Sequence, residues 1–138
     1  MLFRTPPEVL LLLVPVLIFS LCFHEFAHAW VAYKLGDPTA KQSGRLTLNP
    51  LAHLDPMGSL MILIIGFGYA KPVPVDARYL KNPRTDMMKV AFAGPAANLL
   101  LAFVGGTIIR THITGGSLIL MLYLFTQINI MLAVFNMI

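Results

Sequence analysis

The stretch that decides the fold is residues 9–33, VLLLLVPVLIFSLCFHEFAHAWVAY. A helix over these residues would be about 37 Å long, enough to cross a hydrocarbon core of about 30 Å. Pro15 is expected to bend it, and Gly36 supplies a left-handed cap at its end. We therefore predict a first membrane-spanning helix over Val9–Tyr33, interrupted near its end by two histidines and a glutamate.

The composition of the chain also indicates a membrane protein. Hydrophobic residues make up 57% of the 138 positions and the mean hydropathy is +0.77, whereas soluble domains are about 45–50% apolar. The length predicts one domain, residues 1–138. The single Cys22 excludes an internal disulfide framework and a cysteine zinc ribbon, so any metal site must use His, Asp or Glu.

Two further apolar runs, Val90–Ile109 and Ser117–Ile138, predict a second and a third spanning helix joined by a short turn. Met57–Phe67 is apolar but too short to cross, which favours a re-entrant or interfacial segment. Turn formers fill the preceding loop, where a short strand over Arg45–Leu48 is expected. The predicted fold class is an all-α membrane protein with about three transmembrane helices, this short segment and a small extended region in the loop.

The basic residues predict the orientation in the bilayer. Of the ten Lys and Arg residues, all but Arg4 and Arg110 lie within residues 34–89. This clustering follows the positive-inside rule and predicts that the 34–89 loop is cytoplasmic and that the amino terminus lies outside. The lipid bilayer is the expected partner. No nucleic-acid partner is expected, because the basic and aromatic residues show no RNA-binding signature.

His24, Glu25 and His28 form a pattern with a specific chemistry. Residues four apart share one face of a helix, so the two histidines can hold one metal ion through neutral imidazoles. A zinc ion lowers the pKa of a bound water toward about 7, and Glu25 can take its proton and pass it to a departing amine. The alternative interpretation, an interhelical polar cluster, is disfavoured because ionisable groups at membrane depth are costly and usually functional.

The chain resembles the site-2 protease family of intramembrane zinc metalloproteases, most closely its compact prokaryotic branch. The resemblance spans residues 8–138 and is carried, besides HEFAH at 24–28, by GRLTLNP at 44–50, HLDPMG at 53–58, GPAANL at 94–99 and FN at 135–136. It implies a hydrolase, a zinc metalloendopeptidase of the prokaryotic plasma membrane, that cleaves peptide bonds in or near transmembrane segments of protein substrates. It also implies one Zn2+ per chain on His24 and His28, with Glu25 as general base and acid and Asn136 as an oxyanion or substrate contact.

The resemblance also implies a third zinc ligand, an Asp in an Asp-Gly motif that follows the position of Asn136. We expect this ligand beyond Ile138, which would make residues 1–138 a core domain that is incomplete at its carboxyl end. His53 and Asp55 are candidates within the chain. The preferred interpretation is that these two residues instead stabilise turns.

Two other features of the sequence each allow two roles. Asn98 is expected either to contact substrate in the active site or to form an interhelical hydrogen bond, on a face of small residues that begins at Gly94. In AKPVPV, residues 70–75, the prolines remove donors from one edge of an extended strand. The other edge, on which Val73 and Val75 keep their N–H donors, could pair with an unwound substrate segment, although a polyproline-like connector fits equally well.

Two functions compete with proteolysis. A metal transporter would favour more ionisable residues along the helices, and the second and third predicted helices have none. A non-catalytic membrane scaffold would account for a zinc site with only two histidines. Metal analysis distinguishes tightly bound zinc with protease activity from transported metal and from no metal.

Overall fold

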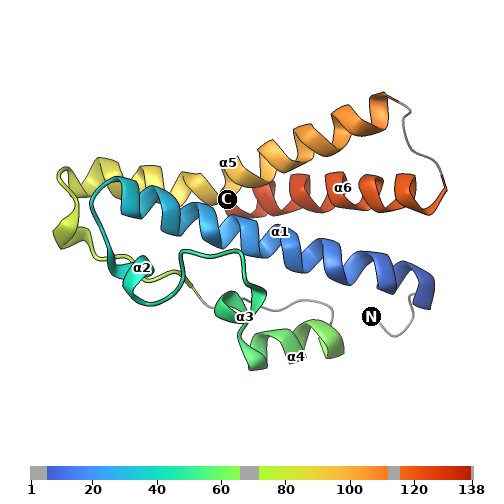
Figure 1. The fold of residues 1–138 in the computed structure, drawn as a ribbon, viewed down its shortest axis with the longest axis horizontal. Coiled ribbons are helices and arrows are strands. Elements are labelled where there is room, and N and C mark those ends of the chain that lie inside the picture. Colours follow the sequence, from blue (N-terminus) through green and yellow to red (C-terminus); the bar gives the residue numbers. More distant parts are fainter. Residues whose placement is uncertain (1–5, 66–71, 112–115, 138) are drawn as a thin grey trace.

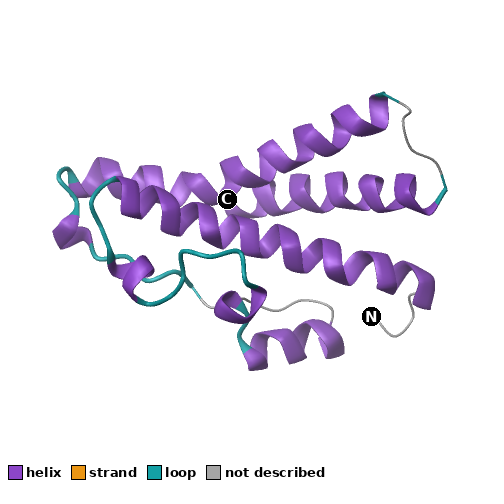
Figure 2. Cartoon of the chain, in the orientation of Figure 1, coloured by secondary structure: helices purple, strands orange, loops and turns teal. Residues whose placement is uncertain are grey.

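The fold was taken from a computed structural model, which describes residues 6–65, 72–111 and 116–137. Its elements follow one another as α1 (Pro7–Lys34), α2 (Thr39–Gln42), α3 (Pro50–His53), α4 (Pro56–Ile65), the 3-10 helix η2 (Ala77–Tyr79), α5 (Pro83–Arg110) and α6 (Ser117–Met137) (Figure 1). The described ranges contain no strand (Figure 2). The all-helical fold class is therefore confirmed.

Three long helices form the core of the structure. α5 packs against both α6 and α1, and α1 also contacts α6. The short helices lie on the side of α1 that faces away from α6 (Figure 1). Each pair of long helices is thus in direct contact, so a polar side chain in the centre can reach two neighbouring helices.

The predicted helix over Val9–Tyr33 is confirmed, with ends at Pro7 and Lys34. Proline is favoured at the first turn of a helix because its missing N–H has no partner there in any case. At the other end, Gly36 has a φ of +110°, the predicted left-handed conformation. Membrane-spanning length and apolarity are found in α1 and α5, and α6 contains a shorter apolar stretch, Leu118–Val134.

The second long helix begins earlier than its apolar run. α5 starts at Pro83, and its first turns are polar, whereas the sequence criterion detected only the apolar part from Val90 onward. The buried Asp86 accepts a hydrogen bond from the backbone N–H of Asn82 and satisfies one of the free donors at the helix start. Pro95 lies inside α5, which changes direction near its middle (Figure 1).

The strand expected over Arg45–Leu48 is wrong. Gly44 has a φ of +74°, and the following residues form bends that precede α3. A strand needs a neighbouring strand for its backbone groups, and the described part of the loop offers none. The short apolar segment predicted at Met57–Phe67 is the helix α4, which ends at Ile65; Phe67 itself lies outside the described residues.

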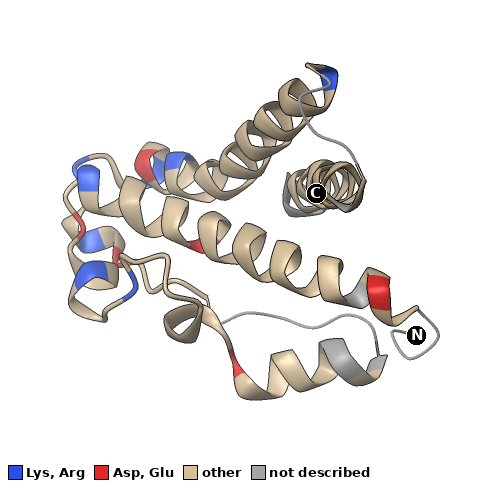
Figure 3. Ribbon diagram, turned by 45° about the vertical axis from the view of Figure 1, so that its right-hand side comes forward, with Lys and Arg blue, Asp and Glu red and all other residues tan. Residues whose placement is uncertain are grey.

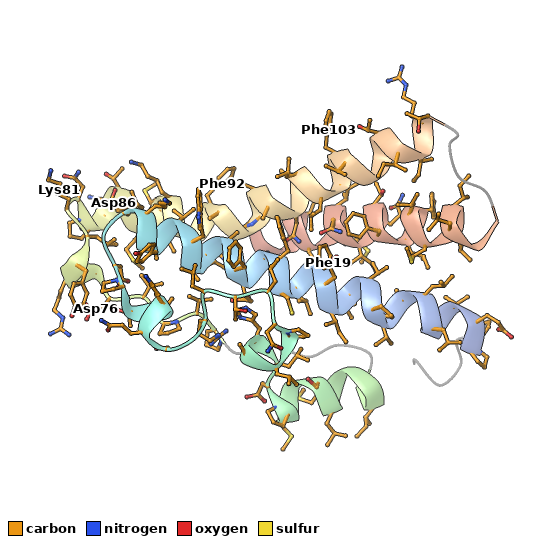
Figure 4. All side chains as sticks on the ribbon, in the orientation of Figure 1. Phe19, Asp76, Lys81, Asp86, Phe92 and Phe103 are labelled. Atoms are coloured by element: carbon orange, nitrogen blue, oxygen red, sulfur yellow. The ribbon has the colours of Figure 1, made fainter. Side chains whose placement is uncertain are left out.

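Side chains are distributed as expected for a chain in a bilayer. Phe92 and Phe103 project outward from α5 and are 56% and 73% exposed, which suits contact with lipid (Figure 4). Basic residues gather at the end of the structure where α1 ends and α5 begins (Figure 3). The apolar middle and the basic end are the pattern that the sequence predicts for spanning helices and an adjoining loop.

Candidate metal centre

Three residues of the HEFAH motif, His24, Glu25 and His28, line one cavity. The cavity has a volume of about 270 Å³. His24 is buried, and Glu25 and His28 are partly buried on the same stretch of α1. The other lining residues come from the segment before η2 and from α5: Pro72, Val73, Val75 and Val90. The helix thus presents both imidazoles and the carboxyl group to a space large enough for a peptide group and water.

The hydrogen bonds of the two histidines leave the same ring nitrogen free in each. His28 Nδ1 lies 2.6 Å from the backbone oxygen of Val90, and His24 Nδ1 lies 2.5 Å from Asn98 Oδ1. Both oxygens can only accept, so each Nδ1 carries a proton and each neutral ring keeps its lone pair on Nε2. The arrangement is the one found in zinc sites, where a second group holds the ligating imidazole in place.

The two free nitrogens converge on each other. His24 Nε2 and His28 Nε2 are 3.0 Å apart. Since neither carries a proton, they cannot form a hydrogen bond with one another. Two nitrogens bound to one tetrahedral zinc at about 2.0–2.1 Å would be roughly 3.3 Å apart. The observed spacing is therefore close to that of two ligands of one ion.

Gly94 of α5 lies directly against the paired nitrogens. A Cβ atom at this position would come within 2.4 Å of both His24 Nε2 and His28 Nε2. A side chain here would occupy the space that an ion shared by the two rings needs. The donor set and this glycine together fit a zinc ion.

Asn98 connects His24 to the third long helix. Its Oδ1 faces His24, and its Nδ2 donates to Asn129 Oδ1 over 2.9 Å. Asn98 and Asn129 are both fully buried. Asn98 is absent from the described lining of the cavity, so its predicted contact with substrate stays a prediction, while the interhelical hydrogen bond is present.

His53 and Asp55 are engaged elsewhere in the loop. His53 Nε2 donates to the backbone oxygen of Thr47 over 2.6 Å, and Arg45 Nε donates to His53 Nδ1 over 3.2 Å. Burial lowers the pKa of His53 below its ordinary value. Asp55 Oδ1 accepts from the backbone N–H of Gly58 at the start of α4. Both residues stabilise turns, and within residues 6–65, 72–111 and 116–137 no three metal-binding side chains come together.

The segment Pro72–Asp76, which forms one wall of the cavity, is held at both ends. Arg45 Nη1 donates to the backbone oxygen of Pro72 over 3.0 Å. At the other end the fully buried Asp37 accepts from the backbone N–H of Asp76 over 2.7 Å. Ala70 and Lys71 of the AKPVPV stretch lie outside the described residues. The wall is thus fixed in place by two residues that follow α1, Asp37 and Arg45, next to the histidine pair.

Asn136 is the predicted site residue of α6. The helix includes its backbone, but its side chain lies outside what the structure describes. Its predicted role as an oxyanion or substrate contact therefore stays a prediction.

An HExxH pair on an apolar helix, with the two free Nε2 atoms 3.0 Å apart and a glutamate lining the same cavity, has the arrangement of a metallopeptidase-type site. The chain belongs to Peptidase family M50, whose sequence model matches residues 12–115. This confirms the family resemblance predicted from the motifs.

Relatives with significant similarity carry metalloprotease names. "Putative zinc metalloprotease YwhC" of Bacillus subtilis is 58% identical over 93 residues, which cover 67% of this chain and 42% of the relative. "Putative zinc metalloprotease Rip2" of Mycolicibacterium smegmatis is 44% identical over 99 residues, covering 68% of this chain and 38% of the relative. The chain thus spans less than half the length of these relatives. No solved structure shows a significant match.

Proposed function

We propose that this protein is an intramembrane zinc metalloprotease that hydrolyses peptide bonds in or near the transmembrane segments of other membrane proteins. The observation that carries the proposal is the pair of unprotonated Nε2 atoms of His24 and His28, which lie 3.0 Å apart in two side chains that line a cavity together with Glu25. The family and the metalloprotease names of the relatives support the same reaction class.

His24 and His28 would hold the zinc ion, one per chain. When bound, zinc supplies a Lewis acid that polarises the scissile carbonyl and acidifies water. Glu25 accepts a proton from the attacking water and then donates it to the departing amine. Asn98 and the backbone oxygen of Val90 hold the two imidazoles in the orientation that exposes Nε2. Two histidines leave the ion short of the usual three protein ligands, so the proposal includes a third ligand after Asn136.

The Pro72–Asp76 wall suggests how a substrate would lie in the cavity. Val73 and Val75 line the cavity beside the histidines, and the wall is anchored at both ends. A helical substrate keeps its scissile carbonyl in its own hydrogen bonds, so it must unwind before cleavage. We propose that the unwound segment pairs with the backbone of this wall, as in strand addition. Cleavage at the wild-type rate after Val73→Pro would rule this pairing out.

The proposed location is a prokaryotic plasma membrane, with the loop of residues 34–89 on the cytoplasmic side. The basic residues at the end where α1 meets the loop support this orientation (Figure 3). His24 and His28 lie in the half of α1 that leads to this end, so water would enter from the cytoplasm. The partners are the bilayer and a transmembrane protein substrate.

The decisive experiment is Glu25→Gln in the full-length protein in nanodiscs, with a fluorogenic transmembrane substrate and metal analysis. Zinc should remain at one per chain, while cleavage should fall by about 100-fold to 10,000-fold because the proton carrier is lost. Glu8→Gln is the matched control, since Glu8 lies on the same helix but is exposed at its first turn. Proteolysis at the wild-type rate in Glu25→Gln would contradict the proposal. Zinc without any wild-type proteolysis would favour a scaffold, and zinc flux across the bilayer would favour a transporter.

A further inference from the structure

A buried network of hydrogen bonds runs from His24 through all three long helices. His24 on α1 contacts Asn98 on α5, which donates to Asn129 on α6, and Asn129 Nδ2 donates back to Ser20 Oγ on α1 over 2.9 Å. Ser20, Asn98 and Asn129 are each 0% exposed. Ser20 and Asn129 are absent from the described lining of the cavity, so the roles of zinc ligand and acid-base catalyst do not account for them.

The donor-to-acceptor direction of the hydrogen bonds in this network is fixed at Asn129 on α6. Asn129 Nδ2 lies 2.8 Å from the backbone oxygen of Phe125, one turn earlier in the same helix. A carbonyl oxygen can only accept a hydrogen bond, so the NH2 group of Asn129 must face it. Asn129 Oδ1 is therefore turned toward Asn98 and acts as an acceptor there.

The orientation of Asn129 in turn determines the orientation of the Asn98 amide and the tautomer of His24. With an acceptor at Asn129, the NH2 group of Asn98 must face α6, and the same group also lies 3.4 Å from the backbone oxygen of Ser20 on α1. Asn98 Oδ1 then faces His24, which requires the proton on His24 Nδ1 and leaves Nε2 free. A flipped Asn98 would present its NH2 group to Nδ1 and drive the ring proton onto Nε2, where it would block metal binding.

We propose that Asn129 is a positioning residue that sets the tautomer of His24 through Asn98, and that Ser20 supports it by accepting from the same NH2 group. This inference rests on the proposed zinc function, since the tautomer matters because Nε2 is to bind the ion. The role of Asn129 is exerted from α6, two hydrogen bonds away from the imidazole.

The test replaces Asn129 by Leu in the full-length protein in micelles. In zinc-free wild-type protein, nitrogen-15 NMR of the histidine ring should show the proton of His24 on Nδ1. In Asn129→Leu it should show a mixture with the Nε2-protonated form. Zinc affinity should fall by about 10-fold, the lower end for residues that orient a ligand. In an Asn98→Leu background the same substitution should change zinc affinity by less than about 2-fold, because the path to His24 is already cut.

Gln127→Leu is the matched control, because Gln127 is an exposed amide on the same helix and should leave the tautomer and zinc affinity unchanged. Asn129→Ala serves if the Leu variant fails to fold, since Ala adds no bulk and removes the acceptor from Asn98. A wild-type tautomer in a folded position-129 variant would overturn the inference, as would an equal loss of affinity in the Asn98→Leu background. Wild-type protein that binds no zinc would instead refute the proposed function, and the zinc-free tautomer measurement would still decide the role of Asn129.

Discussion

His24 and His28 on α1 and His53 at the end of α3 are all held by hydrogen bonds, but the bonds differ in which ring nitrogens they use. In His24 and His28, the partners of Nδ1 are acceptors, and the two free Nε2 atoms lie 3.0 Å from each other. In His53, Arg45 donates to one nitrogen and the other donates to the Thr47 oxygen. His53 has no lone pair left for a metal, although it is as well buried as His24.

This difference shows that a potential metal ligand is defined by the direction of its hydrogen bonds as much as by its burial. An acceptor at Nδ1 prepares the opposite nitrogen for an ion. A donor at Nδ1 together with an acceptor at Nε2 makes the ring a structural crosslink. The histidine pair should therefore respond to substitutions through zinc binding, and His53 through stability.

The largest effect is expected from Gly94→Ala, which affects His24 and His28 but not His53. The added Cβ would come within 2.4 Å of both Nε2 atoms, so the rings or α5 must move. Zinc affinity should fall by about 100-fold or more, at or above the top of the range for residues around a ligand. Isothermal titration with zinc measures this. Gly106→Ala is the control on the same helix, because its Cβ would meet nothing within 4 Å; a similar loss in both variants would contradict the close approach at Gly94.

Asn98→Leu should have the next largest effect, because it removes the acceptor that distinguishes His24 from His53. Zinc affinity should fall by about 10-fold to 100-fold, with the helical content retained. Competition with a zinc chelator dye is a suitable measurement. Thr107→Val on the same helix is the control, since Thr107 is exposed and its hydroxyl donates to the backbone oxygen of Phe103 in its own helix. Unchanged affinity in Asn98→Leu would remove the distinction between the two kinds of histidine.

His53→Leu should show the opposite behaviour. It leaves the Thr47 oxygen and the Arg45 guanidinium each without one partner, which should lower the free energy of unfolding by about 1–3 kcal/mol. Zinc stoichiometry and affinity should stay at the wild-type values. Thermal unfolding in detergent and metal analysis on the same sample test both parts. Ser43→Ala, at an exposed position of the same loop, is the control; loss of zinc in His53→Leu would mean that His53 belongs to the metal centre.

The smallest expected effect is a pH dependence that arises from His53. Burial lowers the pKa of this side chain below its ordinary value of 6.5, so the unfolded chain takes up the proton first as the pH falls. The stability that neutral His53 contributes is present above 6.5 and is lost as the pH drops toward the lower pKa of the folded state. The difference in unfolding temperature between wild type and His53→Leu should therefore shrink between about pH 8 and pH 5. A difference that is constant with pH would contradict this.

The sequence predicted the helices and the HExxH motif because both depend on local patterns. Apolar length placed α1 to within two residues at each end, and a spacing of four put His24 and His28 on one face. The start of α5 at Pro83 was missed because its first turns are polar and resemble the loop. The strand over Arg45–Leu48 was wrong because strand propensity alone cannot provide a neighbouring strand.

The support of the metal centre depends on tertiary contacts and could be predicted only in part. Asn98 was recognised as polar in an apolar helix, but whether it faces substrate or a neighbouring helix depends on how α5 and α6 pack. Gly94 was assigned to a face of small residues without its contact with the imidazoles. Ser20 was missed, although it lies four residues before His24 and shares its helix face. The partner of His28 is the backbone oxygen of Val90, which the identity of the residue in the sequence cannot indicate.

The closed path of hydrogen bonds has a consequence for biogenesis. Membrane helices enter the bilayer in the order of synthesis, and Asn129 lies on the last of the three long helices. Until α6 packs against α1 and α5, Asn98 lacks the acceptor that orients it, and His24 has no fixed tautomer. During insertion the HExxH motif of the nascent chain would therefore lack the fixed His24 tautomer, and under the proposed function a newly made molecule could hydrolyse peptides only after its three long helices have packed together.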